Sequence, residues 1–404
     1  MKIKITKGLA KGSITAPPSK SMAHRLLICA ALCEGESRIR GISSCEDVAA
    51  TLDCMAAFGI NARREGEDCI IEGRGISAFS PSAPLYCRES GSTLRFLIPI
   101  ALALGKTVMF KGAPSLMQRP LDVYERLAKE HGLVYLCDGE SITVKGPLPS
   151  GEYTVVGNIS SQFISGLLFA LPLLEGDSRI KIIPPVESRS YIDMTLSALS
   201  LFGVSCYFEN DCTIYIPGNQ RYQPRALSVE GDYSGAAFPA ALNLFGGEVD
   251  IEGLNPTSIQ GDRVYSKYFD MLGRGVPTIH IGDCPDLGPI LFAVAAAKSG
   301  GVFTGTKRLK IKESDRAAAM AEELSKLGTS VTVYEDKVIV YPKEFHAPTS
   351  PLCGHNDHRI VMSLSILLTL LGGEIEGAEA VAKSYPEFFS HLNALGIGAY
   401  EYDA

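Results

Sequence analysis

The sequence of 404 residues has no tryptophan, no low-complexity tract and no long apolar run. Its longest predominantly apolar stretch, residues 360–371, is too short to span a bilayer, which takes about 20 residues of helix. The first residues, MKIKITKGL, lack the apolar segment of a secretory signal peptide. These absences predict a cytoplasmic protein with no membrane partner.

Positive charge is also in deficit, because 38 lysines and arginines face 45 aspartates and glutamates, for a formal net charge of −7. An acidic chain is poorly suited to bind a nucleic acid, so any anion site must be a local cluster of cations. The eleven cysteines form no C-x-x-C pair, which favours reduced thiols over a disulfide framework or a zinc site. No metal site is therefore expected.

A recurring glycine divides this chain, whose length suggests two or three domains. It follows an apolar residue or a histidine, precedes an extended stretch, and returns about every seventy residues, with a short fifth interval. The six positions are Gly59, Gly132, Gly203, Gly273, Gly328 and Gly396. We interpret them as the helix ends of six copies of one unit, of which the fifth is shortened.

Each copy begins with a polar cluster and an apolar helix, continues through a short strand and a second helix, and generally ends in two strands joined by a polar turn. Six βαβαββ-type repeats predict an α/β fold class. The repeats alone do not say how they are grouped, and we favour two lobes of three. The segment Ile216–Arg225, rich in Pro, Gly and Gln, resembles a hinge between the lobes.

The second helix of five copies carries a signal for its N-terminus. Three serines are followed by an acidic residue at the capping-box spacing, a fourth serine can cap, and a proline suits the first helical position. The expected positions are Ser44, Pro120, Ser190, Ser314 and Ser384.

The segment Ala16–Ile28, APPSKSMAHRLLI, has the features of an anion site. Its two prolines disfavour helix before Ser19, which can then cap the apolar run that follows. A helix N-terminus beside Lys20, Ser21 and Arg25 combines the helix dipole, point charges and a hydroxyl donor, as phosphate or carboxylate recognition requires. A surface helix with two solvated cations explains the segment equally well.

Cations outnumber carboxylates in the polar clusters, although the chain as a whole is acidic. If the opening helices share a direction within each lobe, their N-termini converge and the clusters form two half-sites that face each other. The cations are Lys20, Arg25, Arg95, Arg119, Lys312, Arg316, Arg359 and Lys383, and the carboxylates are Asp286 and Glu313.

Eight motifs occur in one order along the chain: PPSKSMAHR, SGSTLR, QRPL, SSQF, SRSYID, KESDR, NDHR and AKSYPEFF. In their order and spacing the chain resembles the 5-enolpyruvylshikimate-3-phosphate (EPSP) synthase family over essentially its whole length. The resemblance implies the two-lobed enolpyruvyl transferase fold, with three repeats per lobe around a pseudo-threefold axis. Lobe one would comprise residues 1–19 and 227–404, lobe two would comprise residues 20–226, and the active site would lie in the cleft between them.

The resemblance also implies a function in the shikimate pathway, on the route to chorismate and the aromatic amino acids. The enzyme would transfer the enolpyruvyl group of phosphoenolpyruvate to the 5-hydroxyl of shikimate 3-phosphate and release phosphate, by addition and elimination through a tetrahedral intermediate. It would be a monomer and would use neither a metal nor an organic cofactor.

Residue by residue, the resemblance assigns two sets of ligand contacts. The set for shikimate 3-phosphate is Lys20, Ser21, Arg25, Ser160, Ser161, Gln162, Ser188, Asp286 and Lys312. The set for phosphoenolpyruvate is Lys20, Gly91, Arg119, Gln162, Arg316, Arg359 and Lys383. The expected catalytic residues are Asp286, Glu313, Lys20 and Lys383, with Asp286 as the base and either Glu313 or Lys383 as the acid. Glu89 and Arg308 stand where the family often has asparagine, so neither is included.

Taken singly, several of these positions also fit plainer roles. Asp286 is equally typical of a helix cap, and the charges of KESDR are typical of a first helical turn. His355 and His358 have an H-x-x-H spacing that suggests a metal, but no third ligand type lies nearby in the sequence. The joint presence of all eight motifs carries the interpretation.

Two rival functions are considered. The first is the related enolpyruvyl transferase that acts on UDP-N-acetylglucosamine. That enzyme usually has asparagine where this chain has Ser21, and a reactive cysteine in a loop where GAPSLMQRP has none. The second is a non-catalytic repeat scaffold, which would not need carboxylates opposite an arginine cluster.

Overall fold

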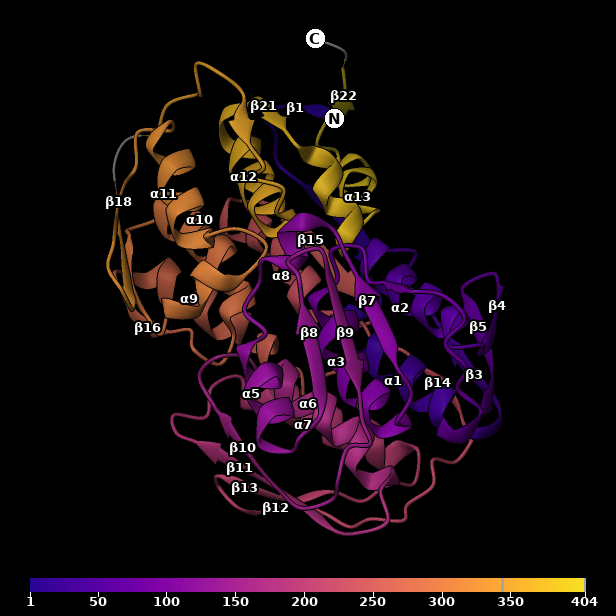
Figure 1. The fold of residues 1–404 in the computed structure, drawn as a ribbon. Coiled ribbons are helices and arrows are strands. Elements are labelled where there is room, and N and C mark those ends of the chain that lie inside the picture. The colour runs from indigo at the N-terminus through magenta and orange to yellow at the C-terminus, as the bar shows by residue number, and fades with distance from the viewer. Residues whose placement is uncertain (343–344, 403–404) are drawn as a thin grey trace. The chain divides into compact units, whose positions relative to one another are not determined.

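The computed structural model describes residues 1–342 and 345–402 (Figure 1). It divides into two compact units. Unit 1 consists of Met1–Ser19 with Gly231–Ala404, and unit 2 of Lys20–Glu230. The chain thus leaves unit 1 after Ser19 and returns to it at Gly231, four residues beyond the boundary expected from the sequence.

Unit 2 alternates helices with short strands. Its helices are α1 (Lys20–Leu32), α2 (Glu46–Ala57), α3 (Gly91–Leu104), α4 (Pro114–Met117), α5 (Asp122–Glu130), α6 (Ser161–Ala170) and α7 (Arg189–Leu201), with the 3₁₀ turns η1 (Ile76–Ala78) and η2 (Leu171–Leu173). Its strands are β3 (Glu34–Arg40), β4 (Asn61–Glu65), β5 (Asp68–Arg74), β6 (Leu85–Tyr86), β7 (Val108–Lys111), β8 (Val134–Cys137), β9 (Ser141–Lys145), β10 (Glu152–Val156), β11 (Ser178–Ile183), β12 (Tyr207–Asn210), β13 (Thr213–Ile216) and β14 (Ala226–Ser228).

The strands of unit 2, all of which are described, form three sheets with one topology. The strand orders are β14-β3-β5-β4, β6-β7-β9-β8 and β10-β11-β13-β12. In each sheet the first pair is parallel and the next two pairs are antiparallel. In the second and third sheets the parallel pair joins the two strands that flank the first helix of a repeat, α3 or α6. In the first sheet β14, from the end of unit 2, pairs instead with β3, the strand that follows α1. In each sheet the last two strands form the hairpin that closes the repeat.

Unit 1 is built from the same kinds of element. Its helices are α8 (Tyr233–Leu244), α9 (Tyr265–Arg274), α10 (Gly288–Ala297), α11 (Arg316–Ser325), α12 (His358–Leu371) and α13 (Phe388–Ala394), with the 3₁₀ turns η3 (Gly261–Val264), η4 (Pro285–Leu287), η5 (Lys307–Ile311) and η6 (Ala378–Lys383). Its strands are β1 (Lys2–Ile5), β2 (Lys11–Thr15), β15 (Glu248–Glu252), β16 (Thr278–His280), β17 (Gly301–Thr304), β18 (Ser330–Val333), β19 (Lys337–Tyr341), β20 (Leu352–Cys353), β21 (Gly373–Glu376) and β22 (Ala399–Glu401).

Two sheets in the described part of unit 1, β16-β17-β19-β18 and β20-β21-β1-β22, repeat the topology of unit 2. Among the described residues the third sheet contains only the parallel pair β2 and β15. The prediction of an α/β fold from repeated units is confirmed, but the shortened copy is the fourth rather than the fifth. Its α9 leads into β16 through residues 275–277, all of which are described, so this copy has no closing hairpin.

The glycines that mark the repeats show the same irregularity. Five of the six have a left-handed φ between 67° and 87°, a conformation that few other residues tolerate. Gly273 is the exception, because it lies inside α9, which continues to Arg274. The pattern was correct in five copies and wrong in the copy that lacks its hairpin.

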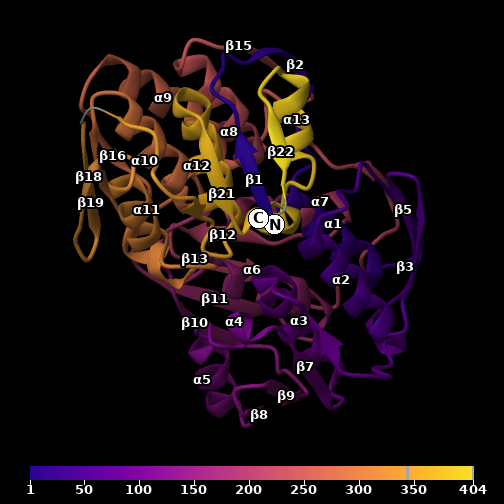
Figure 2. The same cartoon turned by 90° about the horizontal axis from the view of Figure 1, so that it is seen from above.

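Each unit has its own hydrophobic core. The core of unit 2 lies between Met22 and Tyr222, where the buried helices α1, α3 and α6 meet the inward faces of the sheets. The core of unit 1 surrounds α8, α10 and α12, which contact one another (Figures 1 and 2). In α10 the residues Gly288–Ala296 are all buried, as expected for a helix that is apolar on every side.

The segment that resembled a hinge is packed into unit 2 instead. Tyr222 is buried and its hydroxyl donates to the Phe169 carbonyl at 2.8 Å. Gln220 donates to the carbonyls of Ser205 and Pro217. The described helices include none that is both long enough and apolar enough to cross a membrane.

Candidate functional site

Three of the predicted clusters in unit 2 lie at helix N-termini. Lys20 begins α1, Gly91 begins α3 and Ser161 begins α6. The side chain of Ser90 accepts from the Thr93 amide, and that of Ser160 accepts from the Gln162 amide. These caps satisfy only part of each helix end, so the remaining first-turn amides can bind an anion.

The side chains of Lys20 and Arg25 both project from α1, but they have different surroundings. The Lys20 ammonium lies 2.8 Å from an oxygen of Asp47, with both side chains largely shielded from solvent. The buried Arg25 donates to Thr195 Oγ1 at 2.9 Å and to the carbonyls of Ser21 and Tyr191. Burial lowers the pKa of Arg25 to about 10, so it remains charged at neutral pH. These contacts hold Arg25 rigidly, whereas Lys20 is paired with Asp47, an ionic partner that a ligand could replace.

Gly91 lies beside two guanidinium groups. A Cβ atom at this position would be 3.0 Å from a terminal nitrogen of both Arg95 and Arg119. Arg95 also donates to Gln162 Oε1 at 2.7 Å, and Gln162 in turn donates to Ser92 Oγ at 2.9 Å. The absence of a side chain at Gly91 therefore lets two arginines gather over the start of α3.

Ser188 is the last expected contact in unit 2. It directly precedes α7, is buried and has a left-handed φ of 54°. The expected cap at Ser190 is therefore wrong, because that residue lies inside α7. A non-glycine residue in this conformation is uncommon and is often found at functional positions.

Arg316 is the centre of the cluster in unit 1. It begins α11, only 1% of its side chain is exposed, and it contacts three carboxylates. Its Nε lies 2.8 Å from Asp357, and its terminal nitrogens lie 2.8 Å from Asp286 and 2.6 Å from Glu313. Burial lowers the pKa of Arg316, but the three carboxylates outweigh this effect and raise it above its ordinary value.

Asp286 is in contact with three cations. Its oxygens lie 2.8 Å from Arg316, 3.1 Å from Lys312 and 3.1 Å from Arg359. Burial lowers the pKa of Lys312, and the Asp286 carboxylate opposes that change. Such surroundings favour the ionised carboxylate, which is the form that a general base requires.

Lys383 extends this cluster from the end of η6. Its ammonium donates to the Asn356 carbonyl at 2.6 Å and to the side-chain oxygen of the same residue at 2.8 Å. Arg359, on the first turn of α12, donates to Ser234 Oγ at 2.7 Å and to the Asp286 carbonyl at 3.1 Å. Asp286, Lys312, Glu313, Arg316 and Arg359 thus form one connected network, and Lys383 is held beside the loop that leads into α12.

Sequence reasoning missed residues that hold the expected ones in place. Asp357 is fully buried, caps α12 through the Arg359 amide and binds Arg316. Asp47 binds Lys20, and the buried Asp262 lies near Asp286 and Arg359. Asp357 had a signal in the sequence, since an aspartate directly before an apolar helix is a typical N-cap. Arg308, excluded from the site, is buried, with a terminal nitrogen 3.4 Å from the Gly282 carbonyl.

Comparisons with known proteins agree over almost the whole chain. Residues 5–392 match the family described as EPSP synthase (3-phosphoshikimate 1-carboxyvinyltransferase). A curated 3-phosphoshikimate 1-carboxyvinyltransferase of Clostridium perfringens is 41% identical, with 98% of each chain covered. The enzyme of the same name from Clostridium kluyveri is 37% identical, with 96% of this chain and 95% of that protein covered.

Solved structures give the same result for the fold. An EPSP synthase of Acinetobacter baumannii superimposes with a TM-score of 0.80 at 25% identity, over 99% of this chain and all of that one. The enolpyruvyl transferase NikO of Streptomyces tendae shares the fold with a TM-score of 0.80 at 15% identity, over 100% of this chain and 99% of that one. With the family model matched from residue 5 to residue 392, the chain belongs to the EPSP synthase family.

Proposed function

We propose that this chain transfers the enolpyruvyl group of phosphoenolpyruvate to the 5-hydroxyl of shikimate 3-phosphate and releases phosphate. The hydroxyl oxygen adds to C2 of phosphoenolpyruvate while the methylene carbon gains a proton, which gives a tetrahedral intermediate. Loss of phosphate and of one methyl proton then restores the double bond. No electrons are gained or lost, so the reaction requires no redox cofactor.

The observation that carries the proposal is the carboxylate of Asp286 held by Lys312, Arg316 and Arg359. A base is needed to take the proton of the acceptor hydroxyl, and cations are needed to bind the carboxylate and phosphate of phosphoenolpyruvate. One network offers both. Arginine suits the second task because its planar fork matches carboxylate and phosphate oxygens.

We assign the ligands to residues of both units. The proposed contacts of shikimate 3-phosphate are Lys20, Ser21, Arg25, Ser160, Ser161, Gln162, Ser188, Asp286 and Lys312. Those of phosphoenolpyruvate are Lys20, Gly91, Arg119, Gln162, Arg316, Arg359 and Lys383. The helix N-termini at Lys20, Gly91 and Ser161 support these assignments, since both substrates are anions.

The acid that protonates the methylene carbon is either Glu313 or Lys383. Glu313 lies 2.6 Å from Arg316, which stabilises its carboxylate and works against its holding a proton. Lys383 is the alternative, and its Nζ donates to two oxygens of Asn356. General acid–base catalysis contributes roughly 10²–10⁴-fold, so the Gln variant of the true acid should lose about that much in kcat. Solvent deuterium incorporated into the methyl group during turnover distinguishes Glu313→Gln from Lys383→Gln.

Phosphate release provides the test of the reaction itself. The purified protein is mixed with phosphoenolpyruvate and one of two acceptors, shikimate 3-phosphate or UDP-N-acetylglucosamine. We expect release only with shikimate 3-phosphate. Release with the nucleotide sugar would favour the related transferase, and no release with either acceptor would favour the scaffold.

A further inference from the structure

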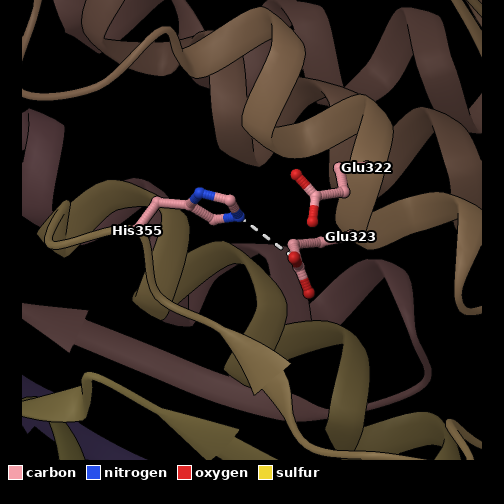
Figure 3. Close-up of side chains that lie close together, drawn as sticks. All are labelled: Glu322, Glu323 and His355. Carbon is pink, nitrogen blue, oxygen red and sulfur yellow. Dashed lines mark hydrogen bonds and ion pairs between the residues drawn. The ribbon is translucent and has the colours of Figure 1, made fainter.

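A buried glutamate lies on α11, the helix that begins at Arg316. Glu323 is on the last turn of α11, and its side chain is fully buried. Figure 3 shows the imidazole of His355 directed at the Glu323 carboxylate, with Glu322 beside it on the same helix. The donor atoms of these three residues lie within 4.8 Å of one another.

Both oxygens of Glu323 are already engaged by the protein. One accepts from Lys326 Nζ at 2.7 Å and from His355 Nε2 at 3.0 Å. The other accepts from the backbone amide of Cys353 at 2.9 Å. A buried carboxylate needs such partners, because an unpaired charge in the core is strongly unfavourable. These contacts fit an ionic anchor better than an empty metal site, since the ammonium of Lys326 already neutralises Glu323.

The segment that Glu323 holds is strained. His355 and Asn356 both have left-handed φ values, 48° and 52°, which non-glycine residues seldom adopt. Gly354 is tightly enclosed, because a Cβ atom there would lie 2.5 Å from Val361 and 2.8 Å from the Glu376 carbonyl. Such a loop keeps its shape only where its surroundings fix it on both sides.

The same segment carries groups of the proposed site. Asn356 accepts both hydrogen bonds from Lys383, and Asp357 binds Arg316 and caps α12. Glu323 contacts Cys353, which precedes the two strained residues, and His355, which is one of them. A shift of this loop would therefore move the partners of Lys383 and Arg316 together.

We propose that Glu323 is a positioning residue, which through Cys353 and His355 fixes the 353–357 loop and so orients Lys383 and Arg316. This inference rests on the proposed function, because those two residues are assigned there to phosphoenolpyruvate. It assigns Glu323 no contact with substrate.

Three variants test the inference. Glu323→Gln keeps the shape of the side chain but removes its charge, and His355→Asn keeps a residue that tolerates a left-handed φ but cannot reach Glu323. Glu322→Gln is the matched control, because Glu322 is exposed, adjacent on α11, and lies 3.8 Å from the same Lys326. For each we measure kcat, both KM values, the Kd of shikimate 3-phosphate for the free enzyme, and hydrogen exchange of peptides that span residues 350–360.

We expect Glu323→Gln and His355→Asn to lower kcat/KM for phosphoenolpyruvate about tenfold or more, with the Kd of shikimate 3-phosphate changed less than twofold. Exchange in residues 350–360 should be faster in both, whereas Glu322→Gln should match the wild type in every measurement. A Glu323→Gln variant that melts earlier but keeps wild-type kcat and KM would reduce Glu323 to a structural role and overturn the proposal.

His355→Asn decides the question if Glu323→Gln does not fold, because His355 is partly exposed and its loss leaves the core intact. A wild-type KM for phosphoenolpyruvate together with unchanged exchange in His355→Asn would overturn the proposal. Hydrogen exchange can be measured without turnover, so it tests whether Glu323 and His355 fix the loop whatever the reaction is. A wild-type protein that releases no phosphate would contradict the proposed function and not the fixing of the loop. Failure of the positioning role and failure of the function are thereby distinguished.

Discussion

Arg316 contacts three carboxylates, so it has a structural role beside its proposed role as a ligand contact. On the sequence alone, Arg119, Arg316 and Arg359 are expected to be equivalent contacts of phosphoenolpyruvate. The structure shows Arg316 buried between Asp286, Glu313 and Asp357, so its removal would leave three carboxylates close together without their shared partner. Loss of one member of a buried ionic network is costly because the remaining charges stay in a poorly solvated place.

We therefore predict that Arg316→Ala lowers the free energy of unfolding by roughly 3–5 kcal/mol, in addition to abolishing turnover. Urea denaturation followed by circular dichroism measures the change. Arg179→Ala is the control, because Arg179 makes a two-pronged pair with Glu209 on the solvent-exposed surface and its loss should cost far less. Equal losses in the two variants would contradict this reading of the Arg316 network.

Asp262 is a buried acid close to the proposed base. Burial raises the pKa of Asp262 to about 6, with a further increase from Asp286 that Arg359 opposes. The ordinary value is 3.8, so the folded state binds the proton more tightly than the unfolded state does. The resulting stabilisation is complete below pH 3.8 and is lost as the pH rises through about 6.

We predict that Asp262→Asn flattens the stability profile between pH 4.5 and 7.5. About 1.5 of the roughly two pKa units lie above pH 4.5, so the wild type should lose about 2 kcal/mol across this range and the variant should not. Urea midpoints at several pH values measure it. The control Asp250→Asn changes an exposed residue of β15 and should retain the wild-type profile. Parallel profiles for the wild type and Asp262→Asn would contradict the prediction.

At the scale of elements, the sequence located the helices better than it located their caps. Where Ser44 was expected to cap, α2 begins at Glu46 and Cys45 is its N-cap residue. Asp315, and not Ser314, caps α11 by accepting from the Ala318 amide. The cap of α13 is at Glu387, three residues beyond Ser384, and α5 begins at Asp122, two residues beyond Pro120. A cap depends on where the preceding chain enters the helix, and tertiary packing decides that entry.

The caps give a prediction at this scale. Asp315→Ala should cost about 1 kcal/mol of unfolding free energy, because an exposed side chain loses its bond to an orphan amide of α11. Ser44→Ala, at the cap expected from the sequence, should change it by less than about 0.5 kcal/mol. Thermal or urea unfolding of the two variants compares them directly. A larger loss for Ser44→Ala would mean that the sequence signal identifies the working cap after all.

The candidate site likewise contains residues that the sequence identified and supporting residues that only the folded structure reveals. The family resemblance selected Asp286, Arg316 and Arg359, and in unit 1 the Asp286 carboxylate contacts both arginines. The partners that hold them, Asp357 above all, were missed. Motifs identify residues that contact ligands, whereas supporting residues become visible only when the loop that carries them has folded.

At the scale of the whole molecule, two hydrophobic cores correspond to the two units. The core of unit 2 is formed entirely by residues between Met22 and Tyr222, and that of unit 1 by residues 3–14 and 237–399. Unit 2 is therefore one continuous stretch of chain with a core of its own, which is the usual condition for independent folding. Strand β14 completes its first sheet by pairing in parallel with β3.

We predict that residues 20–230, expressed alone, fold cooperatively and bind shikimate 3-phosphate more weakly than the full chain, because Asp286 and Lys312 are missing. The fragment should release no phosphate from phosphoenolpyruvate, since Arg316, Arg359 and Lys383 are missing as well. Urea unfolding measures whether the fragment folds cooperatively, and titration calorimetry measures its affinity for shikimate 3-phosphate.

A fragment of residues 20–226, cut at the boundary expected from the sequence, would keep only the first residue of β14 and lose the Val229–Arg40 backbone bond. At about 1 kcal/mol for each lost hydrogen bond, it should unfold at a lower urea concentration than the longer fragment. Equal midpoints would show that β14 adds nothing to unit 2, and a longer fragment without a cooperative transition would show that the core of unit 2 depends on the rest of the chain.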